Sequence, residues 1–418
     1  MVAPAVGGLG TLSPRVWFTV IVCGLGYFVD VYDLILFSIV KNTSLTDIGV
    51  SAANLQDASE LILGAQMVGM LVGGVIFGVL ADKRGRLSIL LTSILLYSLM
   101  NIANAFVSSV PVYALFRFMS GVGLAGELGV AITLVAEIMP RESRGYGTTI
   151  VATPGILGAV AAYLVHELFN WQTAYVIGGL MGLALLATRV RVFESGMFKA
   201  AAEKTVTKGN VLMLFTKQRI GRYLACIAIG LPVWYVIGLL VTFSAGFTAE
   251  SGSVASVIDG QSVMWAYVGL AAGDLFSGLL SQLLRSRRRT ILLFLLITIA
   301  ASAWYLLTPD KSTTLTYFQC SVLGFGVGYW AVFITTAAEQ FGTNLRATVA
   351  TTVPNIVRGS LFPALALFGF LRKYYADTNS TPRIFSALIV GGITMVLALI
   401  GWYFLKETYG KELDYVER

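Results

Sequence analysis

With 56% hydrophobic and only 12% charged residues among its 418, the chain is too apolar for an ordinary soluble domain, in which about 25% of residues are charged. Its mean hydropathy of +0.79 predicts a polytopic membrane protein. The net charge of +7 does not indicate a nucleic-acid site, because the basic residues fall in the connections between apolar segments, where they orient the chain against anionic lipid.

Twelve apolar segments are long enough to be membrane-spanning helices or nearly so, since about 20 residues cross the hydrocarbon core. They cover residues 16–40, 57–80, 87–107, 111–139, 145–168, 172–193, 220–247, 261–284, 290–308, 313–339, 346–371 and 382–406. Lys and Arg are concentrated in the connections on the side that holds both termini. Positively charged connections stay in the cytoplasm, so we expect both termini to be cytoplasmic.

The first segment carries two carboxylates in the run Gly26-Tyr27-Phe28-Val29-Asp30-Val31-Tyr32-Asp33. An ionised aspartate near the middle of a spanning helix costs roughly 2.5–3.5 kcal/mol on insertion scales, so such residues usually face a polar cavity. Asp30 and Asp33 are three residues apart and share a helix face. We expect them to line an ion or substrate path. The alternative is that neighbouring helices satisfy both acids for packing alone.

Two motifs indicate a family. The connection after the second segment reads Gly78-Val79-Leu80-Ala81-Asp82-Lys83-Arg84-Gly85-Arg86, which resembles the signature loop of the major facilitator superfamily in its sequence, its place and its side of the membrane. The fourth segment carries R-x-x-x-G-x-G from Arg117 and E-x-x-P-x-x-x-R-G from Glu137 to Gly145. These resemble the pattern of the sugar, organic-anion and aromatic-acid branches of that superfamily.

This resemblance implies an all-α membrane protein with twelve transmembrane helices in two six-helix bundles. We expect an N-terminal bundle over residues 1–193, a cytoplasmic linker over 194–219 and a C-terminal bundle with a cytoplasmic tail over 220–418. The halves repeat each other weakly, because Gly73 and Gly78 fall on Gly273 and Gly278 at an offset of 200 residues. Such a repeat predicts a substrate site between the bundles near the midplane.

Arg117 and Asp33 are expected at similar depth. Each lies six or seven residues from the outer end of its segment, roughly 10 Å below the surface at about 1.5 Å per residue. The two could form an ion pair, and a carboxylate that alternately gains and loses a cationic partner can carry a proton. The alternative is a permanent bridge between the two helices.

Asp274 and Arg358 are expected about 20 Å deep in the second half. A guanidinium can hold a carboxylate in a bidentate manner, so Arg358 is the best-placed cation for an anionic substrate. A mutual Asp274–Arg358 bridge is an equally good alternative. The first, seventh and tenth helices line the cavity in the superfamily, and their aromatic residues are candidate substrate contacts or core packing: Tyr27, Tyr32, Trp234, Tyr235, Tyr329 and Trp330.

The G-x-x-x-D-x-Y-D pattern in the first segment resembles that of aromatic acid/proton symporters, and its Tyr-Asp part resembles proton-coupled sugar porters. The resemblance implies proton-coupled symport of a small organic anion by alternating access, with Asp33 as proton carrier and Arg117 as its partner. Asp30 and Glu127 would tune this site. Ion pairs at the cytoplasmic face would stabilise the outward-open state. The residues expected to form these pairs are Asp82, Arg86, Glu137, Arg144, Glu339 and Arg346.

Other functions remain open from the sequence. A proton antiporter, an exporter or a carrier of amines or sugars is the main alternative, because buried acids outnumber buried arginines. An enzyme is not expected, since the chain has no metal-ligand spacing, nucleophile elbow or Walker loop. We expect no cofactor and no metal, and a functional monomer in the bacterial inner membrane whose partners are lipid, protons and a small-molecule substrate.

Overall fold

The computed structural model describes residues 14–84, 86–126, 151, 154–194 and 211–410. In the first half these residues form a series of α-helices: α1 (Pro14–Asp47), α2 (Leu55–Arg84), α3 (Arg86–Asn104), α4 (Val110–Leu124), α7 (Gly158–Leu168) and α8 (Trp171–Glu194). A short 3-10 turn, Ala52–Asn54, leads into α2. The first helix is longer at both ends than the segment 16–40 that the sequence predicts.

The second half is more broken. After a 3-10 turn at Val211–Phe215 come α10 (Ile220–Ala228), α11 (Leu231–Trp234), a π-helix η4 (Tyr235–Val241) and α12 (Ser244–Glu250). The remaining helices are α13 (Asp259–Leu283), α14 (Arg287–Leu307), α15 (Thr313–Gly326), α16 (Trp330–Glu339), α17 (Thr343–Gly359), α18 (Leu361–Tyr374) and α19 (Pro382–Phe404). Three of the predicted spans are thus interrupted: the seventh, the tenth and the eleventh.

Nine helical stretches in the described residues are long and apolar enough to cross a bilayer. They correspond to the predicted first, second and sixth to twelfth segments. Three further apolar helices in this part of the chain are shorter: Leu90–Asn104, Val110–Leu124 and Pro154–Leu168. The membrane-protein fold is confirmed, whereas the count of twelve spanning helices stays a prediction, because much of the expected fourth and fifth segments lies outside the described residues.

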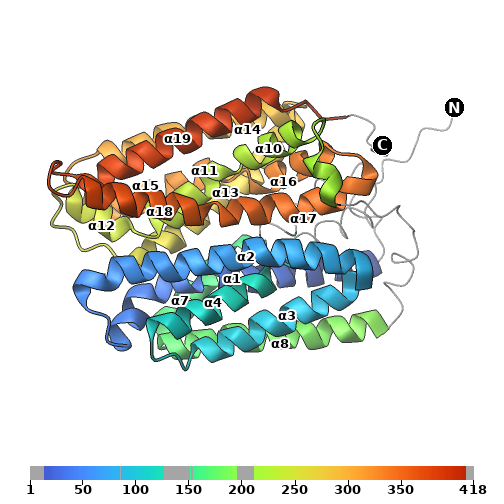
Figure 1. The fold of residues 1–418 in the computed structure, drawn as a ribbon, viewed down its shortest axis with the longest axis horizontal. Coiled ribbons are helices and arrows are strands. Elements are labelled where there is room, and N and C mark those ends of the chain that lie inside the picture. The colour runs from blue at the N-terminus through green and yellow to red at the C-terminus, as the bar shows by residue number, and fades with distance from the viewer. Residues whose placement is uncertain (1–13, 85, 127–150, 152–153, 195–210, 411–418) are drawn as a thin grey trace.

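The two halves of the chain form two layers of roughly parallel and antiparallel helices (Figure 1). Helices α1 to α4, α7 and α8 lie on one side, and α10 to α19 lie on the other. Helix α2 runs along the boundary against α17 and α18, and α13 contacts both α1 and α7 across it. We call the end where α1 ends and α2 begins, residues 47–55, the α1–α2 end. The other end, where α1 begins and α19 ends, is the termini end. The predicted domain limits stay predictions.

Small residues allow the same close helix contact in each layer. A side chain at Gly73 of α2 would overlap the backbone of Val122 in α4, and one at Gly273 of α13 would overlap the backbone of Phe325 in α15. The pairs α2–α4 and α13–α15 are the two most extensive helix contacts in the described structure. Because apolar surface gives no net drive for association in lipid, such close backbone packing holds spanning helices together. The repeat seen in the sequence therefore corresponds to equivalent packing.

Two interruptions in the second half have identifiable structural causes. Pro232 lies in the first turn of α11, so it begins a new helix after α10 instead of continuing the old one. The chain then enters the π-helix η4, an arrangement frequent at functional sites. Between α15 and α16, Gly328 packs so closely on Gly273 that only a residue without a side chain fits. Both breaks lie beside the predicted substrate residues of the seventh and tenth spans.

Candidate functional site

Arg117 is fully buried in α4 and makes three hydrogen bonds within the first half. Its Nε donates to Gln66 Oε1 at 3.3 Å, its Nη1 donates to Asn101 Oδ1 at 3.1 Å, and its Nη2 donates to the backbone carbonyl of Asp33 at 2.8 Å. Arg117 and Asp33 are therefore neighbours, as their predicted depths suggest. All three donor positions of the guanidinium are directed at acceptors from α1, α2 and α3, so this arginine is firmly held.

Asp33 is also fully buried, and α8 approaches it at Gly178. A Cβ at Gly178 would overlap Asp33 Oδ1 and the ring of Tyr32, so the missing side chain makes room for the carboxylate. Tyr32 donates from its hydroxyl to the carbonyl of Ala174 at 2.9 Å. The face of Tyr175 lies 5.7 Å from the Arg117 guanidinium, within cation–π range. A buried acid and a buried cation thus lie close together beside aromatic rings.

Arg358 lies buried in α17, 4% exposed, with its guanidinium 5.5 Å from the ring centre of Trp330. Its Nη1 donates to Asn355 Oδ1 at 3.4 Å, and its Nε has no hydrogen-bond acceptor among the described residues. Tyr27 and Asp30 of α1 and Tyr267 of α13 lie close enough to interact with it electrostatically. Arg358 therefore faces the acid-bearing helix α1 across the boundary and has donor capacity left for a ligand.

Asp274 does not bridge to Arg358 in the described structure. Its Oδ1 instead accepts a hydrogen bond of 2.8 Å from the backbone N–H of Ala331, in the first turn of α16. The first N–H groups of a helix have no partner within the helix, and a carboxylate there also interacts favourably with the helix dipole. The predicted alternative of an Asp274–Arg358 bridge is thus wrong for this conformation, and Asp274 caps a helix that the sequence did not reveal.

The predicted aromatic contacts divide into two groups. The hydroxyls of Tyr235 and Tyr329 donate to the carbonyls of Ala387 and Ile229 at 2.8 and 2.7 Å, so with Tyr32 they hold helices of one layer together. The indole N–H groups of Trp234 and Trp330 find no acceptor among the described residues. Buried donors of this kind are costly unless a ligand or water satisfies them. Trp234, Trp330 and Tyr27 remain candidates for substrate contact.

The α1–α2 end is closed by a buried ion pair between the layers. Lys41 Nζ in α1 lies 2.5 Å from Asp259 Oδ2 at the start of α13, and the two side chains are 3% and 6% exposed. Asn42 donates to the same oxygen at 3.1 Å. The other oxygen accepts from Ser244 Oγ at 3.2 Å and from the backbone N–H of Ala245 at 2.8 Å. A buried pair so fully bonded must be broken before this end can open.

A second set of charges joins the layers nearby but is more exposed. Asp57 in α2 accepts from Arg372 at 2.8 Å and from Lys373 at 2.7 Å in α18. Glu60 lies 3.6 Å from the same Arg372. Asp57 is 47% exposed and Lys373 66%, so solvent screens their attraction. This set supports the closure but contributes less than the buried pair.

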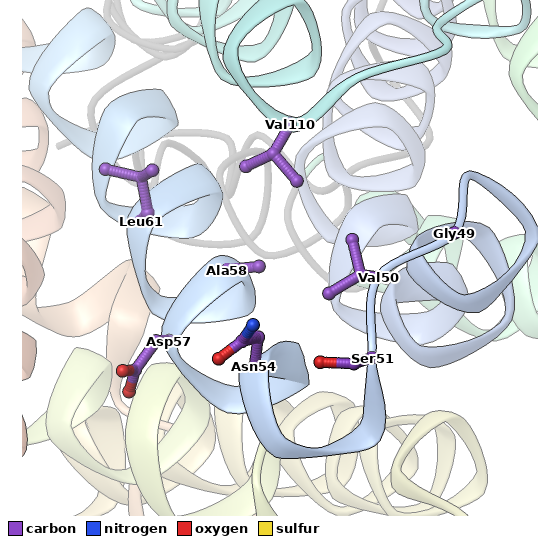
Figure 2. Close-up of a pocket in the computed structure, with 8 residues that line it drawn as sticks. All are labelled: Gly49, Val50, Ser51, Asn54, Asp57, Ala58, Leu61 and Val110. Atoms are coloured by element: carbon purple, nitrogen blue, oxygen red, sulfur yellow. The ribbon is translucent and has the colours of Figure 1, made fainter.

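A hollow of about 460 Å³ lies at the same end. Figure 2 shows the residues that line it, which are Gly49, Val50, Ser51, Asn54, Asp57, Ala58, Leu61 and Val110. It lies over the turn between α1 and α2 and the start of α4. None of the predicted substrate or coupling residues lines it. We therefore regard it as a surface feature of the loop region and not as the substrate site.

At the termini end, Glu339 forms a bidentate pair with Arg287, with both N–O distances 3.1 Å, and accepts from Thr408 at 2.7 Å. Both partners belong to the second layer. Of the other predicted gate residues, Arg346 lies in α17. The side chains of Asp82 and Arg86 are not among those that the structure describes. Glu127, Glu137 and Arg144 lie wholly outside the described residues. The proposed gate roles therefore stay predictions.

Glu407 anchors the chain after α19 to the start of α14. Its carboxylate accepts from Ser286 Oγ and from the backbone N–H groups of Arg287 and Arg288, at 3.0 and 3.2 Å for the latter two. Partial burial by itself would raise the pKa of Glu407, but these hydrogen bonds, with one from the N–H of Tyr409, hold that pKa below its usual value. The carboxylate form therefore stabilises this contact.

We expect Glu407→Gln to lower thermal stability at neutral pH, and the difference from wild type to shrink in acid. A carboxylate with a depressed pKa contributes stability above its unfolded pKa and loses it as the pH falls through the folded one. Thermal unfolding of the purified protein at about pH 7 and about pH 4 would measure this. Asp377→Asn, on the exposed turn after α18, is the control. An equal difference at both pH values would contradict the assignment.

Several residues of these clusters have no signal in the sequence. Gln66 and Asn101 look like isolated polar residues in apolar segments. Lys41 and Asp259 stand at the ends of their segments, where charges normally face water. The pair is 218 positions apart, so only the folded chain brings it together. Asn355 is equally inconspicuous, although its side chain connects the layers.

Comparison with known proteins agrees with this fold. The model of the Major Facilitator Superfamily matches residues 16–361. The niacin transporter NiaP of Acinetobacter baylyi is 26% identical over 427 residues, which cover 94% of each chain. The 4-hydroxybenzoate transporter PcaK of Pseudomonas aeruginosa is 30% identical over 178 residues, 42% of this chain and 39% of that protein.

Among solved structures, the proton:xylose symporter XylE bound to 6-bromo-6-deoxy-D-glucose superposes with a TM-score of 0.73. The match covers 96% of this chain and 98% of that one, at 17% identity, and so reports on the fold alone. The family model extends over most of the sequence, and the described helices have the arrangement of a solved transporter of the same superfamily. The chain belongs to the Major Facilitator Superfamily.

Proposed function

We propose that the protein is a secondary active transporter that carries a small organic anion, a carboxylate with an aromatic ring, together with a proton. The observation that carries the proposal is Arg358, a buried guanidinium with an unused Nε beside the ring of Trp330. A guanidinium binds a carboxylate in a bidentate manner, while the flat face of an indole suits an aromatic ring. Relatives named for niacin and 4-hydroxybenzoate support this choice of solute.

Asp33 is the proposed proton carrier. It is buried beside Arg117, whose hydrogen bonds to Gln66 and Asn101 hold the cation in place. A small displacement of α1 would change the distance between the carboxylate and this fixed charge. Since an adjacent cation favours the ionised form of an acid, such a displacement would favour release or uptake of a proton. Asp30, three residues before Asp33 and close enough to interact electrostatically with Arg358, is the proposed connection to the substrate.

Alternating access would use the boundary between the layers. In the proposed orientation, with both termini in the cytoplasm, the α1–α2 end faces outward and is closed by the Lys41–Asp259 pair. Opening it would expose both charges to water, and closing it would bury them again. Relative rocking of two halves about a central site is the general mechanism for carriers built from repeats.

Proton movement in proteoliposomes tests the proposal. Purified protein would be reconstituted with an external pH-sensitive dye, and pools of aromatic acids, aliphatic monocarboxylates, dicarboxylates, amines and sugars would be added in turn. We expect external alkalinisation with the aromatic acids, and its loss in Arg358→Gln. Acidification with amines would instead favour antiport of cations, and a signal with sugars alone would overturn the choice of an anion.

A further inference from the structure

The amide of Asn355 lies between the proposed anion site and the other layer. Its Oδ1 accepts the long hydrogen bond of 3.4 Å from Arg358 Nη1. Its Nδ2 donates to the backbone carbonyl of Ala125 at 2.9 Å and to that of Thr351 at 3.0 Å. The side chain is 2% exposed, so water does not substitute for these partners. One amide thus bonds at once to the proposed substrate cation and to the first layer.

Ala125 is the residue that follows α4, the helix that carries Arg117. Its backbone carbonyl accepts the hydrogen bond that Asn355 donates from the second layer. Arg117 lies eight residues before Ala125, about 12 Å along the helix axis. A force on the end of α4 therefore acts on the helix that holds the Asp33–Arg117 site.

The packing around Asn355 is tight. A Cβ at Gly74 of α2 would lie 3.0 Å from Asn355 Cβ and 3.1 Å from its Nδ2. One turn further along α17, a Cβ at Gly359 would lie 2.9 Å from Leu71 Cβ. Contacts this close change in discrete steps, because packed side chains are not continuously deformable. Asn355 can therefore keep its bond to Ala125 only while α17 and α2 remain together.

We propose that Asn355 is the positioning residue that couples anion binding at Arg358 to the proton site on the first layer. This inference rests on the proposed function. A carboxylate that binds the unused Nε of Arg358 draws the guanidinium toward itself and lengthens the hydrogen bond from Nη1 to Asn355 Oδ1, which is already long at 3.4 Å. The amide is then free to turn, its bond to Ala125 weakens, and the end of α4 separates from α17 at lower cost. Anion occupancy thereby favours opening on the termini side, and empty Arg358 favours closure.

Two variants disturb this link from opposite layers. Asn355→Ala removes the amide, and Gly74→Ala places a methyl group against it without changing any polar residue. Gly392→Ala in α19 is the matched control, because a Cβ there meets nothing within 4 Å. Each protein would be purified, its thermal unfolding recorded, and its transport measured with the aromatic acid that gives the largest proton signal in wild type.

We expect both variants to exchange the anion in counterflow. Accumulation driven by a proton gradient should fall at least about fivefold, because typical coupling between two sites corresponds to about 5–150-fold in affinity. Fewer protons should also move per anion. Gly392→Ala should match wild type in both assays. A merely structural role for Asn355 would slow exchange and accumulation together at an unchanged proton-to-anion ratio, and that result would overturn the inference. If Asn355→Ala does not fold, Gly74→Ala decides alone by the same ratio.

Failure of the inference is distinguishable from failure of the proposed function. A wild type that moves no protons with any anion overturns the proposed function, and the inference with it. A wild type that couples anion to proton, with two variants that couple equally well, overturns the inference alone.

Discussion

Asp33→Asn is expected to abolish accumulation of the anion against its gradient while leaving counterflow exchange measurable. Asparagine fits the space that Gly178 leaves for the side chain but cannot release a proton in the physiological range. A gradient of one pH unit supplies about 1.4 kcal/mol, enough for about tenfold accumulation per proton. Without the carboxylate, the ratio of internal to external anion should approach one. Uptake of labelled anion into proteoliposomes with an imposed pH gradient measures this.

Asp310→Asn provides the control for this experiment. Asp310 is exposed on the turn between α14 and α15 and has a positive φ of 44°, which asparagine also adopts readily. This variant should accumulate the anion as wild type does. Full accumulation by Asp33→Asn would show that another group carries the proton, and Asp30 would then be the first to test.

The neighbourhood of Asp33 and Arg117 was predictable because both lie in unbroken apolar helices. In such a helix, depth follows from counting residues, and an ionisable residue in lipid needs a polar neighbour. The partner atoms were not predictable. Arg117 donates to the backbone carbonyl of Asp33, and its other donors go to Gln66 and Asn101, whose places depend on how α2 and α3 pack.

Depth counting did not identify the hydrogen-bond partner of Asp274. Asp274 and Arg358 were assigned similar depths, which made a bridge plausible. The predicted tenth span is interrupted between Gly326 and Trp330, however. The first turn of α16 then offers a backbone N–H from which Asp274 accepts a hydrogen bond. No proline marks this break, and the close approach of Gly328 to Gly273 that accompanies it is a tertiary contact. Local sequence carries no record of such a contact, so the role of Asp274 could be found only in the folded chain.

Lys41 stands at the end of a predicted segment, where a charge is expected to face water, but it is buried. Counting basic residues in connections treats Lys41 as a solvated loop charge, which serves the prediction of topology. In the structure the first helix continues to Asp47, beyond the expected end at residue 40, and carries Lys41 into the boundary between the layers. There it meets Asp259, which begins α13. No short sequence pattern relates these two residues. Breaking their pairing is expected to have a large effect on conformation.

Lys41→Met is expected to shift the protein strongly toward a conformation that is open at the α1–α2 end. Removing one partner of a buried pair costs about 3–5 kcal/mol, because the remaining charge is left without compensation. Opening relieves this cost by exposing Asp259 to water, so the closed-to-open ratio should fall on the order of a hundredfold or more. Spin labels at exposed Ser51 and Ser256, one in each layer, would report a longer distance.

Lys373→Met is the matched control, because Lys373 also pairs across the boundary but is 66% exposed. Exposed pairs contribute about 0–1 kcal/mol, so the distance distribution should hardly change. The double variant Lys41→Met with Asp259→Leu should return toward the wild-type distance, since replacing both charges by apolar groups removes the uncompensated one. If Lys41→Met and Lys373→Met behave alike, burial does not determine the strength of the closure. If the double variant stays open, the pair acts through shape and not through charge.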